Sequence, residues 1–249
     1  MSRHATFERA DPRLAPHSRR RPAVASLPLA MQPSPVQCPE CGAPAPFRGA
    51  AISLVCEYCG STVVRTGVDV RLIGKVSALL DNGSPILLGS KGTFDALPFE
   101  LVGRLQLRHG RGTWNEWFVN FADGTVGWLA DAQGSFSMLR PRDKTIVAGK
   151  VPAFDDLQLG KPIVIQGVPH VLVERRAADY QGAEGVLPFV AEPGVEFYSA
   201  DLRGYDGEFV TLDYGEDGDH QRPTLYMGRA VELAGLGLQP LRRFAGWRA

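Results

Sequence analysis

Apolar and polar residues alternate in short runs along most of the chain from Asp81 onward. The runs are separated by Gly, Asp, Asn and Pro, the residues that favour turns. In the stretch 118–129, Asp123-Gly124 lies between two apolar-rich arms, which is a strong signal for a β-hairpin. The pattern therefore predicts a mainly β protein built from many short strands.

A different pattern precedes these runs, at residues 67–80. Its apolar positions follow the spacing of one helix face, although Gly74 interrupts the pattern. These positions are Val70, Leu72, Ile73, Val76, Leu79 and Leu80. We expect a short linker helix over 67–80.

Two β-rich stretches resemble each other along the chain. Leu88 aligns with Leu159, a shift of 71 residues, and Phe118–Leu129 aligns with Asp201–Leu212, a shift of 83 residues. The further matches at the first shift are Gly89/Gly160, Pro98/Pro169, Leu101/Leu172, Val102/Val173 and Arg104/Arg175. The increase in the shift, 83 − 71 = 12, indicates an insertion within 177–193.

These matches predict a tandem all-β module with a first repeat at 81–150 and a second at 151–249. Each repeat would hold about four or five strands, which are too few to enclose a large core alone. Two small SH3-like barrels and a two-sheet sandwich both fit, with a terminal strand or helix within 231–249. The alternative is chance similarity between two β-rich stretches.

All four cysteines of the chain lie in one pattern, within 37–66. Cys38-Pro39-Glu40-Cys41-Gly42 and Cys56-Glu57-Tyr58-Cys59-Gly60 are two C-x-x-C-G knuckles, and the interval between them is close to that of a zinc ribbon. Two knuckles supply four thiolates in a tetrahedral shell. We expect a structural Zn²⁺ held by Cys38, Cys41, Cys56 and Cys59.

Three other uses of the cysteines are weaker. Cysteines this close in sequence form poor disulfides, and no convincing secretion signal is present. A redox C-x-x-C motif would not need a second copy, and the spacing fits an iron–sulfur cluster less well. A closed four-thiolate shell has no open coordination position, so the expected metal is not catalytic.

The net charge is zero, from 27 basic and 27 acidic residues, but it is unevenly distributed. Residues 1–36 hold six arginines against Glu8 and Asp11, a net charge of +4, and we expect a disordered basic leader there. It could be a targeting signal, a basic arm or a solvated leader that precedes a start at Met31. Residues 37–249 carry −4, which argues against nucleic acid as the partner. No apolar run is long enough to span a membrane.

The sequence contains no nucleophile elbow, no phosphate loop and no metal-binding pair of histidines. The most suggestive cluster joins aromatic and charged residues, which are favoured at binding hot spots. Its members are Trp114, Glu116, Trp117, Trp128 and Arg104. Strand alternation places Trp114 and Glu116 on one face and Trp117 on the other. We expect one Trp in the core and another on a surface that contacts a partner.

Several motifs follow the cysteines in a fixed order. They are Gly-Thr-Trp-Asn-Glu-Trp at Gly112–Trp117, Asp-Gly-Thr-Val-Gly-Trp-Leu at Asp123–Leu129, and the runs 207–214 and 225–229. As a set they resemble the bacterial domain-of-unknown-function 4178 family, over about residues 38–230. That family has no established activity to carry over. The resemblance implies genes near those of polyamine aminopropyltransferase-like and small membrane proteins, and hence a part in a multi-protein system.

Together these features predict a cytoplasmic, non-enzymatic, zinc-binding adaptor or binding protein that docks a protein partner. A nucleic-acid-binding zinc ribbon is the first alternative, favoured only by the basic leader. An enzyme that uses loop carboxylates such as Asp123, Asp206 or Asp213 is the second.

Overall fold

The computed structural model describes residues 36–48, 51–66, 69–75, 79–110, 112–143, 146–147, 149–205, 207–216 and 223–244. These residues form a mainly β fold with four cysteines gathered near its N-terminal end, which confirms the predicted fold class. The expected disordered leader lies outside the described residues, except for Val36. Among the described residues, no helix has the length and apolar character needed to cross a bilayer.

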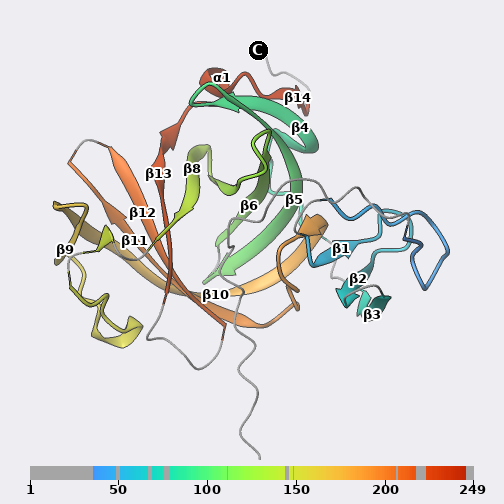
Figure 1. The fold of residues 1–249 in the computed structure, drawn as a ribbon, viewed down its shortest axis with the longest axis horizontal. Helices are drawn as coiled ribbons and strands as arrows, with labels where there is room; N and C mark the ends of the chain where they lie inside the picture. Colours follow the sequence, from blue (N-terminus) through green and yellow to red (C-terminus); the bar gives the residue numbers. More distant parts are fainter. Residues whose placement is uncertain are drawn as a thin grey trace, which may run out of the picture.

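Eight antiparallel strands close into one barrel (Figure 1). Around the barrel their order is β5-β6-β7-β8-β13-β12-β11-β10, and β10 pairs back onto β5. They are β5 (Leu97–His109), β6 (Gly112–Phe121), β7 (Val126–Ala132), β8 (Ser135–Arg142), β10 (Val168–Leu187), β11 (Glu196–Arg203), β12 (Glu208–Gly215) and β13 (Thr224–Val231).

The single barrel corrects the expected arrangement of two small barrels or a sandwich. Strands β5 to β8 form one four-stranded meander and β10 to β13 form another. Each meander has two unpaired edges, and the edges of one pair with those of the other at β8–β13 and β5–β10. Closure between the halves therefore satisfies the backbone groups that two separate four-stranded sheets would leave exposed.

The two meanders share a hydrogen-bond register. A bulge between Leu101 and Gly103 on β5 has a counterpart between Leu172 and Glu174 on β10. Strand β10 is longer than β5, at 20 residues against 13. Beyond Tyr180 this strand pairs with β5, and its last residues pair with the ribbon strand β1 (Ser53–Val55). This later part of β10 therefore supplies the seam that closes the barrel.

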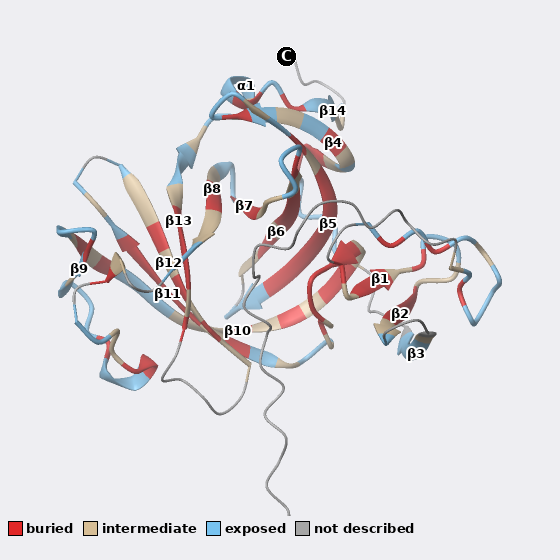
Figure 2. Cartoon of the chain, in the orientation of Figure 1, coloured by how far each residue is buried: buried red, intermediate tan, exposed pale blue. Residues whose placement is uncertain are grey.

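Short elements cover the outside of the barrel. The first half is covered by β4 (Ile86–Phe94), α1 (Leu233–Leu236) and β14 (Gln239–Leu241), so the C-terminal part holds both a helix and a strand. The second half is covered by the 3₁₀ turn η2 (Phe154–Asp156) and β9 (Pro162–Ile165). Figure 2 shows that the strands of the barrel wall are largely buried. Many residues on both faces of the wall are therefore shielded from solvent, although others, such as Val173 and Arg203, are exposed.

The ribbon strands β1, β2 (Ser61–Thr66) and β3 (Asp69–Lys75) extend the sheet from the end of β10. The expected linker helix over 67–80 is wrong, because its described core is the strand β3. Val70 and Leu72 pair with Arg65 and Val63 of β2, so the open edge of β2 supplies backbone partners that an isolated short helix would lack.

Candidate metal centre and barrel cavity

Four cysteine thiols meet at one point in the ribbon. Their Sγ atoms all lie within 4.8 Å of one another, and the Cys38–Cys59 and Cys41–Cys56 pairs are each 3.7 Å apart. Sulfurs at the corners of a tetrahedron around Zn²⁺ are separated by about 3.8 Å, given a metal–sulfur distance of about 2.3 Å. None of the four cysteines is in a disulfide. The thiols are therefore placed to hold one metal ion.

Local backbone geometry sets the thiol positions. The Gly42 N–H donates to the Cys38 carbonyl and the Gly60 N–H donates to the Cys56 carbonyl, both at 2.8 Å. The φ angles of Gly42 and Gly60 are +73° and +70°, a left-handed conformation that glycine adopts without strain. Each C-x-x-C-G sequence is thus a tight turn that directs two thiols to the same side.

The thiols differ in environment. Cys38 and Cys56 are buried, while Cys41 is exposed. The Ser61 hydroxyl and the Ser61 backbone N–H lower the pKa of the Cys59 thiol to about 6. The thiolate is the form that binds metals, and these two hydrogen bonds favour it at Cys59.

The ribbon is joined firmly to the barrel. Leu54 of β1 pairs with Val186 of β10, and the Ser53 hydroxyl donates to the Phe189 carbonyl at 2.5 Å. Arg48 forms a surface ion pair with Glu100 of β5 at 2.5 Å. Ribbon and barrel side chains also share one hydrophobic cluster. A surface hollow of about 480 Å³ lies along the junction between ribbon and barrel. No buried polar side chain lines it.

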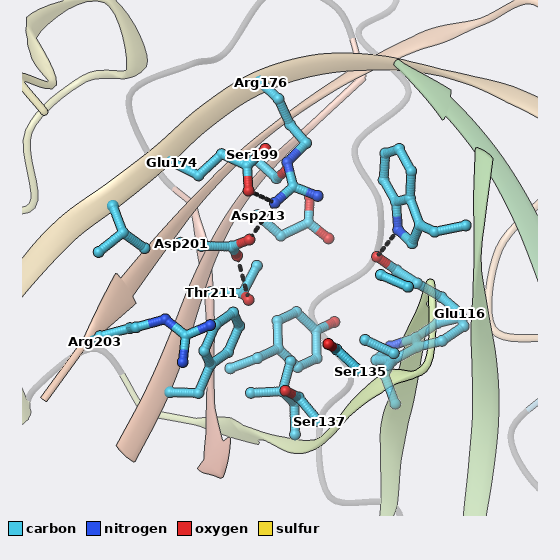
Figure 3. Close-up of a pocket in the computed structure, with 18 of the residues that line it drawn as sticks. Glu116, Ser135, Ser137, Glu174, Arg176, Ser199, Asp201, Arg203, Thr211 and Asp213 are labelled. Atoms are coloured by element: carbon cyan, nitrogen blue, oxygen red, sulfur yellow. Dashed lines mark hydrogen bonds and ion pairs between the residues drawn. The ribbon is translucent and has the colours of Figure 1, made fainter. Parts of the chain in front are cut away.

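A second cavity, of about 200 Å³, lies in the lumen of the barrel (Figure 3). Every barrel strand except β5 contributes side chains to its wall. One side of the wall is polar and the other is aromatic. Ser199 and Asp201 of the polar side are only 6% and 8% exposed.

An ion pair dominates the polar side of the lumen (Figure 3). The Arg176 guanidinium donates to the Asp201 carboxylate at 2.5 Å, and the Thr211 hydroxyl donates to the other oxygen of that carboxylate at 2.8 Å. Arg176 also pairs with Glu174 nearer the solvent. Burial raises the pKa of Asp201, although the Arg176 charge opposes the shift.

The aromatic side faces this pair. The Trp114 indole N–H donates to Glu116 at 3.4 Å, and the Arg176 guanidinium lies 5.1 Å from the centre of the Trp114 ring. Trp128 packs against Phe118, with ring centres 5.0 Å apart. The lumen therefore combines carboxylates with flat apolar surfaces.

The five predicted partner-binding residues fall on opposite faces of the barrel wall. Trp114, Glu116 and Trp128 line the lumen, and Arg104 stacks over Trp117 on the outside at 5.1 Å. Arg104 also donates to Asn115 at 3.0 Å, in a buried polar network. Arg104 and all three of these tryptophans are buried. The expectation of an exposed Trp surface is therefore wrong for these residues, because both faces of the wall are covered.

Of the carboxylates expected for an unrecognised enzyme, the two that the structure describes lie in different places. Asp123 lies in the turn between β6 and β7, where the Thr125 hydroxyl lowers the pKa of its carboxyl. Asp213 lines the lumen, and Asp206 lies outside the described residues.

Sequence reasoning missed Arg176, Ser199, Asp201 and Thr211. They come from three strands, and pairing of β10 with β11 and of β11 with β12 brings them together. One signal was present in the sequence. At the two shifts, Arg176 aligns with Leu105 and Asp201 aligns with Phe118, so a charged residue stands where the other half has an apolar one.

The family comparison covers the barrel and its outer layers. The model of a domain of unknown function (DUF4178) matches residues 87–233, from β4 to the start of α1, and leaves the ribbon outside. No curated protein and no solved structure matches the chain. The family match bears out the resemblance that the motifs indicated: the chain belongs to the DUF4178 family.

Proposed function

We propose that the protein is a non-enzymatic, zinc-containing binding protein whose barrel lumen holds a small ligand. The carrying observation is the cavity of about 200 Å³, whose wall includes the buried polar side chains of Ser199 and Asp201. An apolar cavity of about 150 Å³ binds benzene in another protein, so the volume here suits a ligand built on one ring. Closed eight-stranded barrels hold single small ligands in the same place.

Loading the lumen with a neutral probe tests this proposal. We expect 2-phenylethanol to shift the indole N–H signals of Trp114 and Trp128 in NMR spectra of the full chain, because both line the cavity. The signal of Trp117, on the outer face, is the internal control. Ala130→Phe should fill the cavity and abolish the shifts, whereas Ala122→Phe, at an exposed turn position, should leave them unchanged. Equal shifts in wild type and Ala130→Phe would refute a site in the lumen.

The metal in this proposal is a structural Zn²⁺. Four thiolates at tetrahedral spacing match the preference of Zn²⁺, and they leave no coordination position for a substrate. Elemental analysis of the full chain should give one zinc per chain, and Cys56→Ser should lose it. Iron at that stoichiometry, with visible absorbance, would indicate a cluster instead. Four reduced cysteines also favour the cytoplasm as the location.

We also infer that the barrel is an internal duplication. The support is the shared register, since Phe118 faces Trp128 as Asp201 faces Thr211, at a shift of 83 residues in both strands. The matched bulges on β5 and β10 add to it. A structure of a second family member with greater similarity between its halves would test this inference.

Docking of a protein partner is the second candidate function. Several exposed apolar side chains lie on or near the β9–β10 hairpin. They are Leu159 at 66% exposure, Val164 at 37%, Val168 at 40% and, in the β11–β12 turn, Tyr205 at 83%. Exposed apolar surface of this kind is typical of sites that contact other proteins. Val164→Asp with Val168→Asp should abolish capture of a defined partner from the native host. If the double variant still captures the partner, this surface is not the docking site.

A further inference from the structure

The two halves of the barrel present different chemistry to the lumen. Leu105 and Phe118 face inward in the first half, and Arg176 and Asp201 occupy the corresponding positions in the second. The aromatic contact of Phe118 with Trp128 corresponds to the hydrogen bond of Asp201 with Thr211. Polar groups thus replace a packed apolar core on one side of the cavity only.

The cavity wall has an excess of negative charge. It contains four carboxylates against two guanidiniums, a formal net charge of −2. The carboxylates are Glu116, Glu174, Asp201 and Asp213, and the guanidiniums are Arg176 and Arg203. Arg203, which lies over the Phe209 ring at 5.1 Å, and Glu174 are both exposed. Without them the wall still holds three carboxylates against Arg176, so the excess of −2 is unchanged. An anion that entered the lumen would meet net repulsion.

The environment of Arg176 shows that the lumen can hold an organic cation. Its guanidinium is held between the Asp201 carboxylate at 2.5 Å and the Trp114 ring at 5.1 Å. Carboxylates and aromatic faces are the two groups that stabilise a desolvated organic cation. Glu116 and Asp213 extend the same chemistry across the cavity from β6 and β12 (Figure 3).

We propose that the lumen binds a small organic cation, with its ammonium group held by Glu116 and Asp213 and its apolar body against Trp114 and Trp128. This inference rests on the proposed function, because it names the ligand class of the same cavity. The Arg176–Asp201 pair serves as the fixed polar wall, and the small side chains of Ala130, Ser137 and Ser199 leave the space open.

Three probes that share a phenyl ring and a two-carbon arm but differ in charge test the ligand class. They are 2-phenylethylammonium, 2-phenylethanol and 3-phenylpropanoate, each titrated into the full chain at constant ionic strength. The readout is the indole N–H shift of Trp114 and Trp128, with Trp117 as the control. We expect the cation to bind about tenfold more tightly than the alcohol, and the anion more weakly than either.

Variants that each remove one carboxylate test which side chains bind the cation. Glu116→Gln and Asp213→Asn should each weaken binding of the cation about tenfold while leaving the alcohol unchanged, since each removes one carboxylate and keeps its size. Asp123→Asn removes the same charge from the β6–β7 turn, outside the cavity, and should change neither. The urea midpoint of every variant checks that it is folded, and either carboxylate variant suffices for the test.

The outcomes separate the two proposals. If no probe shifts Trp114 or Trp128, the proposed function fails and the ligand class fails with it. If the alcohol binds and the cation gains no advantage, the lumen is a binding site but the ligand class is wrong. A cation preference that survives both carboxylate variants would also overturn the inference.

Discussion

Replacing Arg176 with methionine tests the strength of the ion pair in the lumen. The side chains of Arg176 and Asp201 are only 17% and 11% exposed, so methionine would leave the Asp201 carboxylate buried without its cation. Loss of one partner of a buried pair destabilises a protein by about 3–5 kcal/mol. We expect the lower end, about 3 kcal/mol at pH 7.5, because Thr211 still donates to Asp201.

Urea unfolding, followed by tryptophan fluorescence, measures this loss. The matched control is Arg229→Met, which removes an arginine from an ion pair with Asp95 whose side chains are 52% and 54% exposed. Such a surface pair contributes up to about 1 kcal/mol. The double variant Arg176→Met with Asp201→Asn should recover part of the stability, since no unpaired charge remains buried.

The pH dependence gives a second readout. Burial raises the pKa of Asp201 above its value in the unfolded chain, and removal of Arg176 takes away the charge that opposes this rise. A carboxyl with a raised pKa favours the folded state while it is protonated, and this contribution is lost as the pH rises through the folded-state pKa. The Arg176→Met variant should therefore be less destabilised, relative to wild type, at pH 5 than at pH 7.5. A loss equal to that of Arg229→Met at both pH values would refute the reasoning.

Three further changes test other parts of the fold. A Cβ at Gly228 would lie 1.8 Å from the Met138 carbonyl, so Gly228→Ala should lower the free energy of unfolding measured in urea by about 3 kcal/mol or more, while Gly235→Ala, which meets nothing within 4 Å, should not. Ser53→Ala removes the donor to the buried Phe189 carbonyl and should lower the free energy of unfolding by about 1–2 kcal/mol. An unchanged free energy of unfolding would argue against that hydrogen bond. Cys56→Ser should raise amide exchange at 182–187 more than in β7 and β8, because the ribbon covers the end of β10; a uniform rise would contradict this coupling.

Local patterns in the sequence predicted the elements whose causes are local. The knuckle glycines Gly42 and Gly60 fix their own turns through a left-handed φ, and Asp123-Gly124 forms the turn between β6 and β7. Strand alternation correctly separated Trp114 and Glu116 from Trp117. Each of these features depends on residues within a few positions of one another.

The errors arose where distant segments decide the structure. Apolar spacing over 67–80 indicated a helix, but pairing of Val70 and Leu72 with β2 produces a strand. Composition gave no reason to prefer one barrel, because closure depends on β5 pairing with residues about 75 positions away on β10, such as Leu107 with Tyr180. The lumen site depends on that closure too. The tandem duplication itself stays a prediction.

One strand links the metal site, the barrel seam and the cavity. Strand β10 is 20 residues long, against about five or six for an average strand. Arg176 lies in its first half, its Tyr180–Gly185 segment closes the barrel against β5, and Gly185–Leu187 pair with β1 of the ribbon. Strand β11 pairs with β10 only as far as Asp179.

Without the ribbon, the last residues of β10 would present unpaired backbone groups at an apolar edge, which invites aggregation. The family match covers all eight barrel strands and leaves out the ribbon. The ribbon thus caps the end of the seam that shapes the lumen. A bound metal would act on the cavity through this edge, at a distance from any ligand, which is the role that a closed four-thiolate site can fill.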